Sequence, residues 1–129
     1  MKNFTKTGGK LILAGLFPLL VVACGGERSV TYSQDVKPIL EKHCFECHQP
    51  GGQGEVASGL NMDSHESLMK GARFGPMIIA GDPEGSNMVV LMEGRADPSI
   101  SMPHGKQQGI PKEDIATIRL WIKQGAKNN

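Results

Sequence analysis

The sequence predicts an all-α domain of about four short helices joined by long loops. Apolar residues recur at the spacing of one helix face in four short stretches, and no β-α-β alternation is present. Between these stretches lie glycine-rich segments without periodicity, in a chain that has 17 glycines among 129 residues. Because long loops in a small domain usually enclose something, we expect the chain to wrap a bound group.

Capping and stop signals place the first two helices. The first is predicted over 33–44, with Ser33 as its N-cap and Pro38 in its first turns. The second is predicted over 62–72, where Asp63 can cap the start and Gly71 can end it. The segment between them, 49–59, is predicted as a loop because it is rich in glycine.

Two further helices are predicted in the second half of the chain. One covers about 84–93 and follows the Asp82-Pro83 start signal. The other, over 111–126, is the clearest, and Gly125 stops it. Its apolar residues form one stripe at helical spacing: Ile115, Ile118, Trp121 and Ile122. The segment 94–110 is predicted as a long loop.

The N-terminal 23 residues are typical of an export signal. Three lysines without any acidic residue precede the mostly apolar run 11–23. That run is too short for a membrane span, and Pro18 interrupts it. It ends in V-V-A-C, which resembles the lipobox of bacterial lipoproteins. This resemblance implies cleavage before Cys24 and lipid modification of its thiol, which would tether the protein to a membrane.

This interpretation divides the chain into a lipoprotein signal peptide (1–23), a short lipidated and flexible tether (24–30) and one domain (31–129). Cleavage would remove three of the 14 basic residues and none of the 13 acidic ones. The remaining domain is slightly acidic and has no basic patch, so nucleic acid is not an expected partner. The domain is also poor in aromatic residues, so a large cofactor could complete its core.

Lipid on Cys24 would leave only Cys44 and Cys47 of the three cysteines, and both lie in the stretch KHCFECHQP. A zinc site usually needs a second ligand pair, which the sequence lacks. A thioredoxin-like dithiol normally lies within a β-α-β unit, which is also missing. The pattern C-x-x-C-H is instead the attachment signature of c-type haem. Two thiols at this spacing can form thioethers with the haem vinyl groups, and His48 then becomes the proximal iron ligand.

The far side of the iron would need a second ligand or stay open. Methionine is a common choice and raises the reduction potential. Five of the six methionines beyond residue 24 lie in or beside apolar stretches, where methionine usually fills the core. Met102 lies in a loop without such a stripe, and we expect it to be the distal ligand. His104 is the alternative, and an open position would favour gas binding or peroxide chemistry.

The chain resembles small class I-type cytochromes c, and most of all the planctomycete-type cytochrome c domain. The resemblance covers roughly residues 30–127. It rests on V-x-P-I-L-x-x-x-C-x-x-C-H, G-L-N-M-D, G-x-x-x-G-P, G-D-P-E-x-S, M-P and W-I-x-x-G-A. It implies one haem c held by Cys44, Cys47, His48 and Met102. The acceptor for the second nitrogen of His48 is not evident from the sequence, and Pro50 and Gly75-Pro76 are candidates.

These features predict a lipid-anchored monohaem cytochrome that carries single electrons and is not an enzyme. We expect a monomer in the cell envelope that faces the periplasm and meets redox proteins transiently. Two alternatives stay open at this point. One is a five-coordinate haem sensor or peroxidase-like enzyme, for which His104 would be the distal base. The other is a lipoprotein without haem that uses Cys44 and Cys47 as free thiols.

Overall fold

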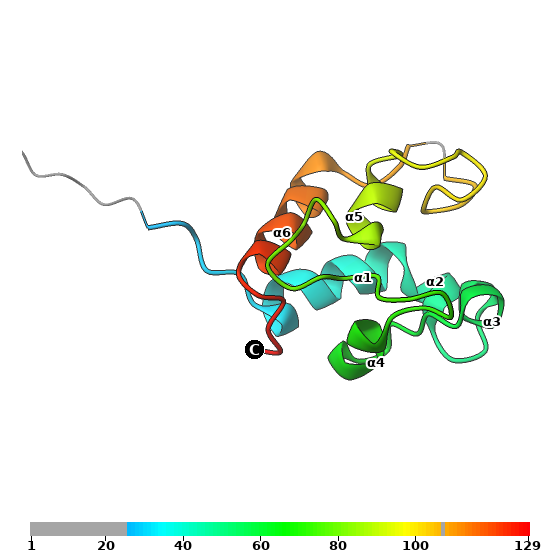
Figure 1. The fold of residues 1–129 in the computed structure, drawn as a ribbon, viewed down its shortest axis with the longest axis horizontal. Coiled ribbons are helices and arrows are strands. Elements are labelled where there is room, and N and C mark those ends of the chain that lie inside the picture. The colour runs from blue at the N-terminus through cyan, green and yellow to red at the C-terminus, as the bar shows by residue number, and fades with distance from the viewer. Residues whose placement is uncertain (1–25, 107) are drawn as a thin grey trace, which may run out of the picture.

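The structure is a computed structural model that describes residues 26–106 and 108–129, so the predicted signal peptide and Cys24 lie outside it. The described residues form helices and no strands, as predicted (Figure 1). One π-helical turn and six α-helices are present, against about four expected. They are η1 (Tyr32–Val36), α1 (Lys37–His43), α2 (Phe45–His48), α3 (Gln53–Ser58), α4 (His65–Lys70), α5 (Asn87–Met92) and α6 (Lys112–Lys123). No helix among the described residues is long and apolar enough to cross a membrane.

The predicted first helix is divided into η1 and α1, and its cap differs from the expected one. Thr31, not Ser33, is the N-cap, and its hydroxyl accepts a hydrogen bond from the Gln34 backbone N–H. The Asp35 carboxylate accepts from the Thr31 N–H in return. This bond is the largest cause of the lowered pKa of Asp35. Reciprocal bonds of this kind satisfy N–H groups at a helix start, which explains why the helical run begins earlier than predicted.

The glycine-rich segment predicted as a loop contains α3, so that prediction was wrong over six residues. The helix ends at Gly59, whose φ of 76° suits glycine. The next helix, α4, is shorter than predicted and is capped by Ser64 rather than Asp63. Gly71 ends it as expected, with a φ of 81°. Short helices between glycines lack a full apolar stripe, and periodicity therefore does not reveal them.

A buried serine occupies the N-cap position of α5. Ser86 is fully buried at the N-cap position. Its hydroxyl accepts from the Ile79 N–H and donates to the Asp82 carbonyl. Asp82, which the sequence suggested as the cap, instead accepts from the Gly85 N–H in the preceding turn.

The core lies where α6 crosses η1 and α1. The predicted stripe of α6 is buried throughout: Ile115, Ile118, Trp121 and Ile122. The centroid of the Trp121 ring lies 5.7 Å from the centroid of the Tyr32 ring and 5.9 Å from the centroid of the His65 ring. Trp121 therefore packs the last helix against the first, as the sequence suggested.

Two histidines on the predicted helices join distant segments of the chain. His65 is half-buried, and its Nε2 lies 2.8 Å from the Ala126 carbonyl. His43, at the end of α1, lies 3.0 Å from the Asp114 carboxylate at the start of α6. Both contacts join residues more than 60 positions apart in the chain. Helix periodicity alone therefore could not reveal them.

Replacing Trp121 with alanine should destabilise the fold by about 3–5 kcal/mol, the usual range for losing a large buried aromatic side chain. Trp121→Phe should cost less, because a ring remains and only the indole hydrogen bond to the Lys127 carbonyl is lost. Chemical denaturation measures both changes. The control is Phe74→Ala, since Phe74 is 92% exposed and should change stability by less than about 0.5 kcal/mol. Equal effects at positions 121 and 74 would contradict this account of the core.

Candidate functional site

The C-x-x-C-H motif forms a single helical turn at the end of α1. Cys44 ends α1 and also precedes α2, so the chain bends there without leaving helical structure. The Cys44 N–H donates to the Leu40 carbonyl, and the His48 N–H donates to the Cys44 carbonyl. Residues three and four apart lie on one face of a helix. Cys44, Cys47 and His48 therefore share one face, as attachment to one planar group requires.

The imidazole of His48 is buried, with 6% of the residue exposed, and its orientation is fixed by a backbone acceptor. Nδ1 lies 3.1 Å from the Leu60 carbonyl oxygen. A carbonyl can only accept, so Nδ1 carries the proton and donates. Nε2 then keeps its lone pair, which is the arrangement of a metal-binding histidine.

The acceptor for His48 differs from the sequence candidates. Neither Pro50 nor the Gly75-Pro76 step takes this role, because Leu60 does. The segment around Leu60 is itself held against α2, since the Met62 N–H donates to the His48 carbonyl at 2.8 Å. A backbone carbonyl leaves no mark in the sequence, so only the structure could identify this partner.

Gly54 in α3 leaves the space beside the free nitrogen of His48 without a side chain. A Cβ at this position would lie 2.7 Å from Cε1 and 2.8 Å from Nε2 of the imidazole. Such contacts are too short for any real side chain. The lack of a side chain at Gly54 therefore leaves the space next to Nε2 of His48 open.

The two thiols lie in different surroundings. Cys47 is exposed, whereas Cys44 is half-buried, and neither forms a disulfide. Burial raises the pKa of the Cys44 thiol to about 11, with Lys106 opposing the shift and Cys47 adding to it. A thiol that resists deprotonation is a poor redox switch or zinc ligand. A thioether has no proton to lose, so the burial of Cys44 suits covalent attachment better than thiol chemistry.

The loop that carries Met102 extends from α5 to α2. At one end the Met102 N–H donates to the Leu91 carbonyl at 3.3 Å. At the other end Lys106 Nζ lies 3.9 Å from the Glu46 carboxylate, in the middle of the motif helix. One ion pair therefore links this loop to the C-x-x-C-H turn. Met102 is half-buried there, whereas His104 is exposed.

The other methionines beyond residue 24 behave as core residues. Met62, Met88 and Met92 are buried in the hydrophobic core, and Met69 and Met77 pack against it. Arg73 donates to the Val56 and Ala57 carbonyls at the end of α3. Among residues 26–106 and 108–129, no cluster of three His, Cys, Asp or Glu side chains could hold a metal ion.

A protein-family model matches the part of the chain that contains this site. The family model described as planctomycete cytochrome C matches residues 44–104, from the first cysteine of the motif to just beyond Met102. That match covers 61 of the 129 residues and includes the whole C-x-x-C-H motif. The resemblance inferred from the sequence motifs is therefore confirmed. No curated protein and no solved structure gives a match.

The match to this cytochrome family suggests a c-type cytochrome and implies covalently bound haem c with its iron. The described residues fit that group. The motif turn places two thiols and an imidazole on one helix face, the Leu60 carbonyl leaves Nε2 free, and Gly54 leaves room beside it. Sequence reasoning found the motif but missed Gly54 and Leu60. The glycine-rich composition of 51–54 was the only available signal for Gly54.

Replacing Gly54 with alanine should impair the cytochrome by placing a methyl group against the His48 imidazole. We expect less holoprotein and a lower unfolding midpoint, with a cost of about 1–3 kcal/mol for overpacking. Haem absorbance per unit protein and thermal unfolding measure these effects. The control is Gly26→Ala, because a Cβ at Gly26 meets nothing within 4 Å. Wild-type yield and stability in Gly54→Ala would show that the imidazole does not need this space.

Proposed function

We propose that the protein is a monohaem c-type cytochrome that carries single electrons in the bacterial cell envelope. Cys44 and Cys47 attach the haem, and His48 and Met102 are its axial ligands. The observation that carries this proposal is the bond from His48 Nδ1 to the Leu60 carbonyl, which leaves Nε2 free beside Gly54. When bound, haem supplies the ferric/ferrous couple. The protein contributes the ligands, the burial and the orientation.

One haem per chain follows from the cysteine count. The sequence has a single C-x-x-C-H motif, and its third cysteine, Cys24, lies in the lipobox. An electron carrier also needs both axial positions filled. Met102 supports this role, because it is half-buried in a loop from which Lys106 reaches Glu46 of the motif helix at 3.9 Å.

Lipid on Cys24 anchors the cytochrome to a membrane, and its partners are redox proteins that dock transiently. The order of lysine-rich start, apolar run and V-V-A-C supports this part of the proposal. The cytochrome functions as a monomer facing the periplasm, where bacterial c-type haem is attached.

The alternatives have weaker support. A peroxidase-like enzyme or gas sensor would need an open iron position, and a peroxidase would also need a polar distal base. His104, the candidate base, is exposed, whereas Met102 is half-buried in the same loop. A dithiol lipoprotein without haem would need reactive thiols, and burial raises the pKa of Cys44.

The test is to produce the full chain together with haem-maturation machinery and to record spectra of both oxidation states. We expect one covalently bound haem per chain and six-coordinate, low-spin spectra in both states. Carbon monoxide should not bind to the reduced protein at equimolar concentration. Lack of covalent haem would overturn both haem hypotheses. A five-coordinate spectrum with carbon monoxide binding would overturn the electron carrier alone.

A further inference from the structure

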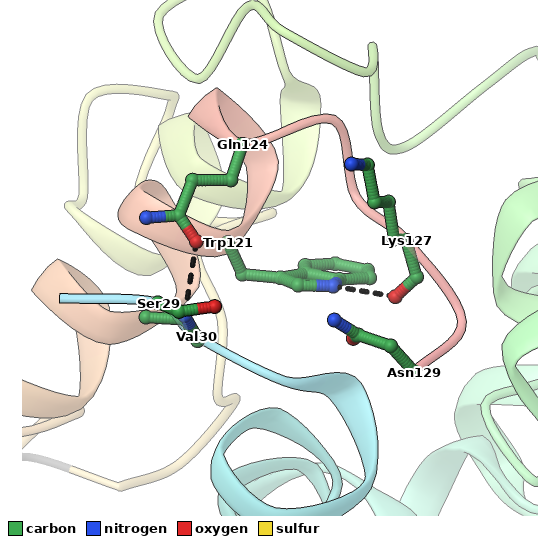
Figure 2. Close-up of a pocket in the computed structure, with 6 residues that line it drawn as sticks. All are labelled: Ser29, Val30, Trp121, Gln124, Lys127 and Asn129. Carbon is green, nitrogen blue, oxygen red and sulfur yellow. Dashed lines mark hydrogen bonds between the residues drawn. The ribbon is translucent and has the colours of Figure 1, made fainter. Parts of the chain in front are cut away.

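The segment that follows the proposed lipid anchor is fixed to the end of α6. The Gln124 side chain holds it at two points. It accepts from the Val30 N–H at 2.9 Å (Figure 2) and donates to the Arg28 carbonyl at 2.7 Å. One residue earlier, Glu27 forms an ion pair with Lys123 at 2.8 Å. The flexible tether expected over 25–30 is therefore held from Glu27 onward. We call residues 27–30 with Lys123 and Gln124 the N-terminal clamp.

The residues that follow α6 close the same end of the molecule. The Trp121 indole donates to the Lys127 carbonyl, and Asn129 accepts from the Tyr32 and Ser33 N–H groups. These segments enclose a small cavity of about 70 Å³, with Trp121 along one side (Figure 2). The clamp therefore rests on a part of the domain that is hydrogen-bonded to the core.

The clamp leaves very little chain between the domain and the lipid. Only two glycines separate Cys24 from Glu27. A fully extended chain covers at most about 3.6 Å per residue, so the Cys24 Cα lies within about 11 Å of the Glu27 Cα. A lipid on Cys24 would therefore place the N-terminal clamp directly at the membrane surface.

The haem-attachment motif lies at the opposite end of the molecule. Figure 1 shows the N-terminal segment and the C-terminus at one end, and α2 and α3 at the other. The helical run from Tyr32 to His48 separates the two ends. At about 1.5 Å per residue this run spans on the order of 20 Å.

We propose that the N-terminal clamp orients the cytochrome on the membrane, with the α6 end against the lipid headgroups and the α2–α3 end facing the aqueous phase. This inference rests on the proposed lipidation of Cys24. The consequence is that redox partners reach the motif from the aqueous side. A flexible tether would let the domain turn its motif toward the membrane as well, and the clamp prevents this.

The test uses the acylated holoprotein in phosphatidylcholine vesicles that contain a nickel-chelating lipid. In this protein all three native cysteines are in thioethers, so one introduced cysteine can take a spin label. The two positions are Asn128→Cys, beside the clamp, and Val56→Cys, which is 63% exposed in α3. Lipid-bound nickel should enhance spin relaxation several-fold more at position 128 than at position 56.

A second variant tests the clamp itself. Replacing both Lys123 and Gln124 with alanine removes the ion pair to Glu27 and both bonds to the segment 28–30, so the chain between Cys24 and Val30 could extend to about 20 Å. The difference between the two labels should then shrink, whereas Gln53→Ala at the far end should preserve it.

Equal relaxation at both labels in acylated wild-type protein would overturn the orientation and leave the electron-carrier proposal intact. An unmodified Cys24, seen by mass spectrometry, would overturn both the anchor and the orientation. Absence of haem would overturn the electron carrier.

Discussion

Replacing both Cys44 and Cys47 with alanine is expected to abolish covalent haem attachment completely. The two thiols are the only ones in the motif, and they lie three residues apart on one helix face with His48. Haem staining of the denatured protein and its intact mass measure the loss. Each single variant keeps one thiol and should retain a smaller amount of haem through one thioether. Haem that survives denaturation in the double variant would contradict the assignment of these residues.

The same double variant should also lower the stability of the fold. The aromatic residues beyond the signal peptide are only Tyr32, Phe45, Phe74 and Trp121, and Phe74 is exposed. A small core of this kind depends on a bound group for part of its apolar burial. Circular dichroism should show lower helix content and a lower unfolding midpoint in the haem-free variant. Unchanged stability without haem would show that the core is self-sufficient.

Replacing Met102 with alanine is expected to leave haem attachment intact and open the distal position. A thioether ligand favours the ferrous state, so its loss should lower the reduction potential. Axial ligands and surroundings shift haem potentials over about 0.8 V, and we expect a fall of roughly 0.1 V or more. Spectroelectrochemical titration measures the potential, and carbon monoxide binding to the reduced protein reports the open site.

Two control variants show whether this effect belongs to Met102. Met69→Ala removes a methionine that packs against the core outside the distal loop, and it should leave the potential nearly unchanged. His104→Ala removes the exposed histidine two residues away and should likewise retain a six-coordinate spectrum. A six-coordinate Met102→Ala that becomes five-coordinate only after His104 is also removed would identify His104 as a competing ligand.

Much of the fold could be predicted from the sequence, because its longest helix carries a strong local signal. The α6 stripe of Ile115, Ile118, Trp121 and Ile122 is buried as expected, since helical periodicity alone places these residues on one face. Helix α3 was missed, because six residues among glycines give too few positions for a pattern. The caps Thr31, Ser64 and Ser86 differ from the predicted ones, since neighbouring serines, threonines and aspartates compete for this role.

For the candidate site, too, some residues could be predicted from the sequence and others could not. The thiols and His48 were identified from local spacing, because one helical turn is enough to bring them together. The Leu60 carbonyl was not, because the bond joins residues 12 positions apart through a backbone atom that every residue has. The lack of a side chain at Gly54 became meaningful only once α3 was placed against the imidazole.

The sequence by itself determined the all-α class, the resemblance to the cytochrome family and the residues proposed to attach haem, because helical periodicity and the C-x-x-C-H spacing act over a few neighbouring residues. Only the tertiary structure decided which carbonyl orients His48 and that the chain from Glu27 onward is held rather than free. The Leu60 bond and the Gln124 contacts join segments that are 12 and more than 90 residues apart. Such contacts follow from how the helices pack, and local sequence carries no signal for them.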